Sequence, residues 1–399
     1  MFDIFKSNEK KELTLVFDIR SSSVGVSILS AQKTGVPKLL FSIREPVTQD
    51  ETVSVDKFLI STMKSLDIVA EKAFKSGVGA PKNIYCVLAS PWYVSQTRII
   101  NLKKETPFIF SQALADELIK KEMEKFKEEH LEKYIKANQE IRVIELKNVK
   151  TVLNGYETHN PINQKVQEAE ITLFVSMCPD QVLKNMEEVI MKYFHQKVIK
   201  FSSFTFASFA VVHSLFKEQP NFLLIDIGGE VTDISMIKRG VFSESISFPM
   251  GRHFMVRGVA RDMSCSDQEA SSYISLLNAG HADPVTEKKL TDIVNKLKIE
   301  WLKNFQESLA NLSRDISVPY TIYLSADLDF LHFFGQVIES EQFNQYTLTE
   351  SKFKIIFLDT VTLHGVVEFE KDISRDSFMM LDASYVNHFL IYGDKSGKI

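Results

Sequence analysis

Two short segments of the chain combine an aspartate with a turn of small residues between apolar strands, a pattern suited to binding phosphate. The clearer one is Asp226-Ile-Gly-Gly-Glu-Val-Thr-Asp233, which lies at the tip of a predicted hairpin. Glycines such as Gly228 and Gly229 let the backbone approach a phosphate closely and turn its N–H groups toward the oxygens. The Thr232 hydroxyl is a further donor. Asp226, at a strand end, is placed to hold a water molecule on a magnesium ion that bridges the phosphates.

The second segment, Asp18-Ile-Arg-Ser-Ser-Ser23, repeats the same strand–turn–strand setting in the first half of the chain. Asp18 takes the place of Asp226 as a metal-side residue, again through water. For either motif alone, the alternative is an ordinary turn capped by its own aspartate. The pairing of the two argues against coincidence, because two such hairpins could hold a nucleotide from both sides. The cofactor-binding candidates are Asp18, Ser21, Ser22, Ser23, Asp226, Gly228, Gly229, Thr232, Asp233 and Gly251, with no catalytic residue among them.

Composition limits the class of protein. A chain of 399 residues is too long for one ordinary core and predicts two or more lobes. The net charge of -5, with acids and bases mixed, gives no basic face for nucleic acid. The three scattered cysteines predict neither disulfides nor zinc and fit a reducing cytoplasm. The longest uncharged stretch, between Lys200 and Lys217, is shorter than a membrane span requires, so we expect a soluble cytoplasmic protein.

Alternating and helical patterns divide the chain into four parts. Each lobe opens with a strand, an aspartate, a small-residue turn and a returning strand; 13–19 with 24–29 and 221–227 with 231–237 are these pairs. A helix is predicted over 55–75. The expected parts are a first lobe at 1–110, a charged helix and inserted subdomain at 111–195 (the α+β unit at about 141–195), a second lobe at 196–350, and 351–399, which completes the second lobe or forms a contact surface.

The segment 111–139 is the most charged of the chain and keeps a narrow apolar stripe. The stripe favours a solvated amphipathic helix that packs by one side. The alternative is a protruding helix that binds a partner.

The two motifs resemble those of the actin-like superfamily, which includes actins, heat-shock chaperones and sugar kinases. Within it the chain is most similar to the branch of the bacterial division protein FtsA and the pilus-assembly protein PilM. The segment 153–161 and the strand 170–176 resemble the inserted subdomain of this branch, and Phe248-Pro-Met-Gly-Arg-His-Phe254 resembles the segment after the second phosphate motif. The resemblance implies an α/β, ribonuclease H-like fold of two lobes with duplicated mixed sheets and a small α+β insertion. It also implies ATP and magnesium as ligands.

The chain departs from this family pattern at several positions. Arg20 stands where the first hairpin has glycine, and Arg252 stands where a second glycine is expected. An arginine at these places could either contact a phosphate or fill the cleft. The late glycine-rich turn reads Leu324-Ser-Ala-Asp327, so Ala326 and Asp327 crowd the adenine side, and the ribose-holding residues are replaced around 271–274. The phosphate half of the site is therefore present and the nucleoside half degenerate.

These observations support three hypotheses. The first is a cytoplasmic scaffold of the FtsA type that docks or polymerises at the inner membrane for cell division, with nucleotide as a conformational ligand. The second is a PilM-like adaptor that binds the cytoplasmic tail of a membrane protein in pilus assembly. The start of the chain, Met1-Phe-Asp-Ile-Phe-Lys6, favours the second hypothesis, and so does an end at 389–399 that is too short for a membrane-binding helix. The length of the chain and the inserted subdomain favour the first. The third hypothesis is a small-molecule kinase, for which no catalytic carboxylate is marked out.

At most a weak ATPase is expected. The expected partners are other cytoplasmic or membrane-anchored division or pilus proteins, with self-association, no nucleic acid and no transmembrane segment. Any membrane association would be peripheral and through such a partner.

Overall fold

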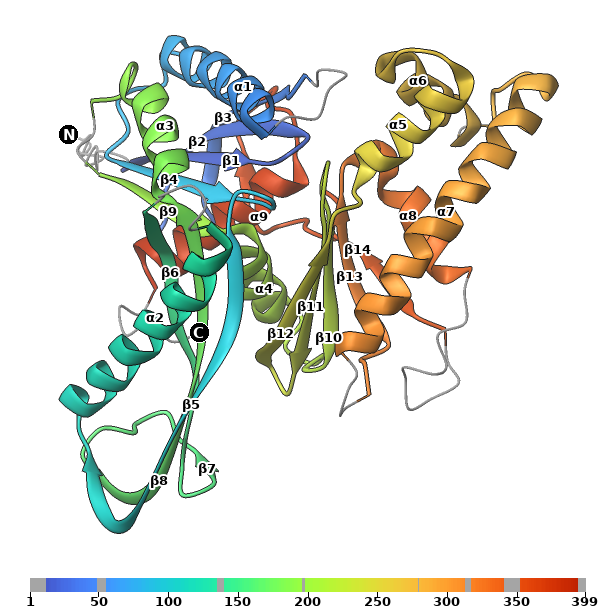
Figure 1. Ribbon diagram of the computed structural model, residues 1–399. Helices are drawn as coiled ribbons and strands as arrows, with labels where there is room; N and C mark the ends of the chain where they lie inside the picture. The colour runs from blue at the N-terminus through green and yellow to red at the C-terminus, as the bar shows by residue number, and fades with distance from the viewer. Residues whose placement is uncertain are drawn as a thin grey trace, which may run out of the picture.

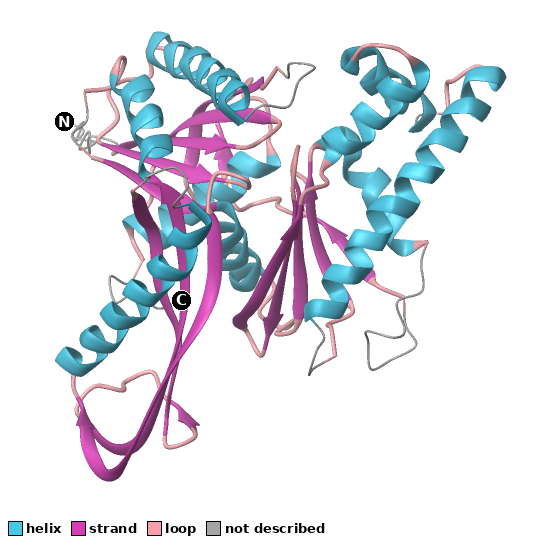
Figure 2. Cartoon of the chain, in the orientation of Figure 1, coloured by secondary structure: helices cyan, strands magenta, loops and turns pink. Residues whose placement is uncertain are grey.

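The described part of the chain forms three β-sheets, which define two lobes and an inserted subdomain (Figure 1; Figure 2). One sheet lies in each lobe, and the third forms a long arm attached to the first lobe. None of the helices in the described part of the chain has the length and apolarity of a membrane span. The computed structural model describes residues 12–48, 55–134, 140–195, 198–278, 280–312, 317–340 and 352–393.

The six-stranded sheet of the first lobe joins an antiparallel half to a parallel half. Its central strands are buried on both faces because helices cover them, which explains their continuous apolar runs. The expected helix α1 (Val55–Lys75) is present and packs on this sheet with α3 (Asp180–Met191). In spatial order the strands are β15 (Glu368–Phe369), β3 (Lys38–Pro46), β2 (Ser23–Ser30), β1 (Leu13–Ile19), β4 (Asn83–Leu88) and β9 (Ile199–Ser203).

The five-stranded sheet of the second lobe repeats the same plan. Its order and strand directions match those of the first sheet once β15 is left out, so the expected duplication of a mixed sheet is confirmed. The strands are β12 (Val241–Phe248), β11 (Thr232–Lys238), β10 (Phe222–Ile227), β13 (Thr321–Ala326) and β14 (Lys354–Phe357). The outer helices of this lobe (Figure 1) are α5 (Arg252–Met263), α6 (Asp267–Asn278), α7 (Pro284–Leu312) and α8 (Leu328–Glu339).

The inserted subdomain is a four-stranded antiparallel sheet with one helix across it. Its members are β5 (Val94–Phe110), α2 (Gln112–Tyr134), β6 (Ile141–Leu153), β7 (Tyr156–Glu157) and β8 (Gln164–Pro179). The subdomain therefore starts before the expected boundary at 111, because β5 pairs with β8 over most of its length. It also ends before 195, because α3 packs against α1 and the first-lobe core.

Helix α2 lies along the inserted sheet with its apolar side inward. Its Met123 and Phe126 are buried in the core of the subdomain, together with the sheet residues Leu173 and Val175. The charged residues of α2 face outward, so the described part of this helix packs as an amphipathic helix. The stripe residues Leu131 and Ile135 lie where no side chain is described.

Two helices that the sequence analysis did not assign lie between the lobes: α4 (Phe204–Leu215), and α9 (Ser377–Tyr385) with a π-helical turn to Ile391. Both contribute to one apolar core that contains residues of both sheets. The described part of the segment after 351, expected to complete the second lobe or to form a contact surface, is divided between the two lobes. Strand β14 extends the second sheet, whereas β15 pairs with β3 and α9 packs against β1 and β2 of the first lobe.

Candidate functional site

The tips of the two expected phosphate hairpins are equivalent turns that face and touch each other. The N–H of Arg20 donates to the Ser23 carbonyl at 3.0 Å in one, and the N–H of Gly228 donates to the Val231 carbonyl at 2.9 Å in the other. Arg20 thus occupies the turn position that Gly228 has in the second hairpin. The aspartates two residues earlier are equivalent as well, since each lies one residue before the end of its strand.

The Arg20 side chain is fully buried and joins the two lobes. Its Nη2 donates to both carboxylate oxygens of Asp226 at 2.6 Å, and its Nη1 lies 3.9 Å from Oδ1 of Asp18. The guanidinium also lies over the rings of Phe204 and Phe378, with 4.3 and 3.7 Å between its central carbon and the ring centroids. Burial opposes the charge, but the nearby carboxylates Asp226 and Asp18 raise the pKa of Arg20. The two carboxylates expected beside a metal ion are therefore bridged by a fixed cation.

A second arginine neutralises Asp18 from the other side. Arg44, near the end of β3, donates to Asp18 Oδ2 and Asp376 Oδ2, both at 2.6 Å, and to the Ser23 hydroxyl at 3.0 Å. Asp376 in turn caps α9, because its carboxylate accepts from the N–H groups of Phe378 and Met379. The start of the C-terminal helix is thereby tied to the first hairpin.

The polar groups of the second hairpin are used within the protein. The N–H of Glu230 donates across the lobes to the Ser21 hydroxyl at 3.1 Å. The Thr232 hydroxyl donates to the carbonyl of Met250 at 2.7 Å, and the Ser325 hydroxyl donates to Asp226 at 2.7 Å. Thr232 is thus engaged by its own lobe.

Gly251 and the start of α5 close the tip of the second hairpin. The N–H groups of Arg252 and His253 donate to the carbonyls of Gly228 and Gly229, both at 2.9 Å. A Cβ at Gly251 would lie 2.2 Å from the Gly228 oxygen, which only glycine avoids. The two hairpins are also close: a Cβ at Gly229 would lie 2.9 Å from the Ser22 nitrogen of the other lobe.

Two residues that depart from the family pattern, Arg252 and Asp327, form an ion pair with each other. Arg252 donates to Asp327 at 2.8 Å and lies over the ring of Phe330. Burial would raise the pKa of Asp327, but the charges of Arg252 and Arg20 lower it below its ordinary value. Ala326 is buried at the end of β13, directly before Asp327.

Glu230 is held on the outer side of the hairpin. It accepts two hydrogen bonds from Arg257 at 2.8 Å and lies 3.0 Å from the His253 ring nitrogen. Burial would raise the pKa of Glu230, but the hydrogen bonds from Arg257 and His253 lower it well below its ordinary value. Both Arg257 and His253 are on α5, so this cluster fixes the helix against the hairpin.

Two further buried carboxyl groups lie nearby. Burial, together with the Asp226 charge, raises the pKa of Asp233 to about 7. Burial also raises the pKa of Asp382 on α9, and the Asp18 charge adds to this shift. Neither oxygen of Asp382 has a hydrogen-bond partner in the described part of the chain. Burial without a partner disfavours the charged form of the Asp382 carboxyl group.

Comparison with known proteins identifies the fold of the chain. No protein-family model matches the chain, and no curated protein sequence matches it. Among solved structures, it is similar to a PilM–PilN type IV pilus biogenesis complex, with 14% identity and a TM-score of 0.55 over 94% of this chain and 96% of that one. The chain has the actin-like fold. The expected fold class is thus confirmed.

Two other solved structures are similar to the chain at TM-scores below 0.5. One is the MamK double helical filament, at 12% identity and a TM-score of 0.45 over 94% of this chain and 97% of that one. The other is a protein from Bacteroides thetaiotaomicron with an actin-like ATPase fold and unknown function. It is 11% identical, with a TM-score of 0.38 over 97% of this chain and 99% of that one.

The residues of this actin-like chain do not fit a magnesium–ATP complex as they are arranged. Asp18 and Asp226, the expected metal-side residues, are each paired with an arginine at 2.6 Å. The N–H groups of Gly228 and Glu230 donate to protein oxygens, so these tip donors are occupied. In the described ranges, no group of three or more His, Cys, Asp or Glu residues could hold a metal ion.

Sequence reasoning missed Arg44, Asp376 and the two rings beside Arg20. Arg44 lies in a strand whose pattern says nothing about its partners, and one of them, Asp376, is 332 residues away. Asp376 could have been found as a helix cap, because it directly precedes Ser377 and an apolar run. Nothing in the local sequence indicated that Phe204 and Phe378 would meet.

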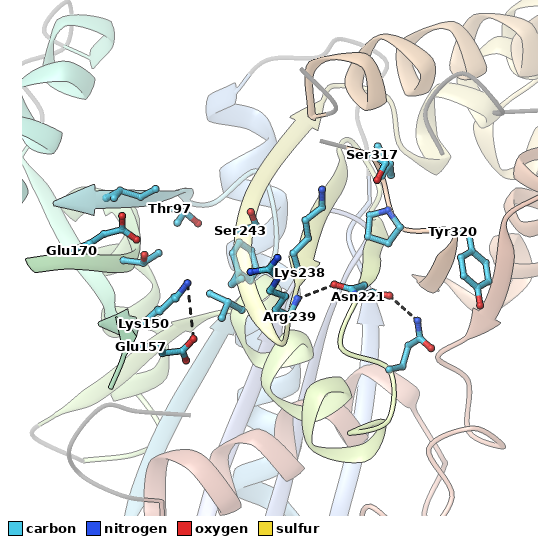
Figure 3. A pocket seen from close by; sticks show the side chains of 17 residues that line it. Thr97, Lys150, Glu157, Glu170, Asn221, Lys238, Arg239, Ser243, Ser317 and Tyr320 are labelled. Carbon is cyan, nitrogen blue, oxygen red and sulfur yellow. Dashed lines mark hydrogen bonds and ion pairs between the residues drawn. The ribbon is translucent and has the colours of Figure 1, made fainter. Parts of the chain in front are cut away.

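A separate pocket of about 740 Å³ lies between the inserted subdomain and the second lobe (Figure 3). Two edge strands border it, β5 of the inserted sheet and β12 of the second sheet. Lys238 and Arg239, at the turn between β11 and β12, line one wall. Lys150, 4.0 Å from Glu157, lines the other. The Lys238 ammonium is buried and has no hydrogen-bond partner in the described ranges, and burial lowers its pKa.

Proposed function

We propose that this protein is a cytoplasmic actin-like adaptor that binds a segment of a membrane-anchored partner, as in pilus assembly, and does not use ATP chemically. The pocket between β5 and β12 carries this proposal, because it is walled by two sheet edges and contains an unpaired lysine. The similarity to PilM in its complex with PilN supports an adaptor role. A scaffold of the FtsA type, which polymerises on a membrane in division, is the other outcome of the tests below.

The pocket suits an extended peptide that carries a carboxylate. Strands β5 and β12 are the edges of their sheets, and an edge strand offers backbone donors and acceptors to an added strand. The buried ammonium of Lys238 lacks an anion, and Arg239 adds positive charge on the same wall. Ile99, with 57% of its surface exposed, offers an apolar contact on the opposite wall. An acidic residue of the partner would pair with Lys238.

A kinase role is not supported by the hairpins. A kinase of this fold needs an open site with a carboxylate base beside a substrate hydroxyl. Here Asp226 is paired with Arg20, and Glu230 with Arg257. Asp233 is buried beside Asp226. These carboxylates hold the hairpins in place.

We expect a synthetic cytoplasmic tail of an inner-membrane pilus or division protein from the same genome to bind this protein. Replacing Lys238 by Glu should weaken the binding about tenfold or more, which corresponds to about 1.4 kcal/mol, because an attractive charge becomes repulsive. Fluorescence polarisation of labelled peptides measures the change. The matched control is Lys64→Glu on α1, an exposed lysine outside the pocket, which should leave binding unchanged.

Three results would count against this proposal. One is that no tail binds at micromolar concentration. Another is that a bound tail is insensitive to Lys238→Glu, which would remove the pocket from the proposal. The third is that the protein sediments as filaments on lipid vesicles without a partner, which would favour the division-type scaffold.

A further inference from the structure

Arg20 is a charged side chain that lies between the two hairpins. It is buried in the middle of the molecule, pairs with Asp226 of the other lobe and lies beside Asp18 of its own. In a hairpin pair that holds a metal-bound phosphate, the cation between two such aspartates would come from the solvent with its ligand. In this chain the cation is part of the polypeptide.

We propose that the guanidinium of Arg20 acts as a resident cation that joins the two hairpins in place of a metal-bound nucleotide, so that the lobes are held together without nucleotide. This inference is independent of the partner pocket, which shares no residue with the hairpins.

The surroundings of Arg20 are built to hold it in this position. The rings of Phe204 and Phe378 lie against the guanidinium, one at the start of α4 and the other on α9. Ring faces stabilise a desolvated cation by cation–π attraction. Arg20 is therefore enclosed by the two rings and by Asp226, while its Nε and Nη1 have no hydrogen-bond partner among the described residues.

The second step is that the tips leave no space for a phosphate group between them. Ser21 accepts directly from the Glu230 N–H, and a Cβ at Gly228 would lie 3.3 Å from the Ser21 hydroxyl. Since a single carbon at Gly229 would already press on Ser22 at 2.9 Å, a larger phosphate requires the hairpins to separate. Separation breaks the ion pair between Arg20 and Asp226. Each charge would then be buried without its partner, which is energetically costly.

The third step is that each neighbouring charge is already paired. Arg44 donates to both Asp18 and Asp376, and Arg252 donates to Asp327. A magnesium ion that entered would have to displace Arg20 from Asp226 or Arg44 from Asp18, and like charges would repel it.

Thermal unfolding with and without magnesium and ATP tests the inference on the intact protein. The wild-type melting temperature should not respond to millimolar magnesium, alone or with ATP, because ligands raise it only by binding the folded state. In Arg20→Gly, which places the residue of the second hairpin at this turn position, Asp226 loses its cation, while Asp18 keeps Arg44. Magnesium should then raise the lowered melting temperature by several degrees, with saturation.

Arg20→Lys serves as the matched variant, since it keeps a positive charge and should remain insensitive to magnesium. A saturable rise for the wild type with magnesium–ATP would overturn the inference, even if Arg20→Gly does not fold. A folded Arg20→Gly that ignores magnesium would overturn it too, because the arginine would then not stand in a cation site. Loss of peptide binding by Lys238→Glu would bear only on the partner pocket, so the two proposals fail separately.

Discussion

Replacing Arg20 by alanine should lower the free energy of unfolding by about 3–5 kcal/mol, since breaking a buried ion pair leaves an uncompensated charge behind. The side chain is fully buried, and the Asp226 carboxylate that accepts from it is buried as well. The variant also loses the contacts with the rings of Phe204 and Phe378. Urea unfolding followed by circular dichroism measures the change.

The control for this prediction is a double-mutant cycle with Asp226→Asn. If the two side chains act as a pair, the double variant should lose less stability than the sum of the two single changes. Lys75→Ala, which removes an exposed partner of Glu71, should leave stability close to that of the wild type. Strict additivity of Arg20→Ala and Asp226→Asn would contradict the bridging role of the arginine.

Replacing Gly251 by alanine should cost about 3 kcal/mol or more, because the added carbon overpacks a rigid place. It would lie 2.2 Å from the Gly228 oxygen and 2.5 Å from the Gly229 oxygen, and neither backbone atom can move without shifting the hairpin. The start of α5 would be pushed away, and the hydrogen bonds from the N–H groups of Arg252 and His253 would lengthen. Chemical denaturation gives the loss.

Gly280→Ala is the comparison for Gly251→Ala. Gly280 has a φ of +69° and nothing near the position of its Cβ, so only the left-handed backbone resists a side chain there. Its cost should be about 1 kcal/mol. Equal losses for the two variants would show that local movement relieves the crowding at Gly251. The tip of the second hairpin would then not be rigid.

The hairpins were predictable from sequence because their signals are local. Strand, aspartate, small-residue turn and returning strand occur within about a dozen residues, and the alternation of β1 with β2 and of β10 with β11 shows in the apolar pattern. The same holds for α1, whose helical spacing predicted its bounds. The sequence also showed that an arginine stands in the first hairpin, but it did not show where the side chain of Arg20 points. Whether it would contact a phosphate or fill the gap depended on Asp226, 206 residues away.

The central helices were missed for a physical reason. Nine residues in a row of α4, from Phe204 to Val212, are buried, so the helix has no polar face and no helical periodicity. In the sequence, the stretch between Lys200 and Lys217 shows only as an uncharged run that is too short to span a membrane. Helix α9 is buried from Phe378 to Tyr385 and shows no amphipathic pattern either. Burial from all sides is a property of the assembled lobes, which a local pattern does not report.

The most direct test of the central claim, that Arg20 holds the lobes together without nucleotide, is the distance between the lobes in solution. Spin labels would be placed by Lys64→Cys on α1 and Lys296→Cys on α7, both exposed positions, with Cys265 replaced by serine and Cys86 and Cys178 left in the core. Pulsed electron–electron double resonance should give one narrow distance distribution that is unchanged by magnesium and ATP. It should broaden in Arg20→Ala. A wild-type distribution that shifts when magnesium and ATP are added would contradict the account.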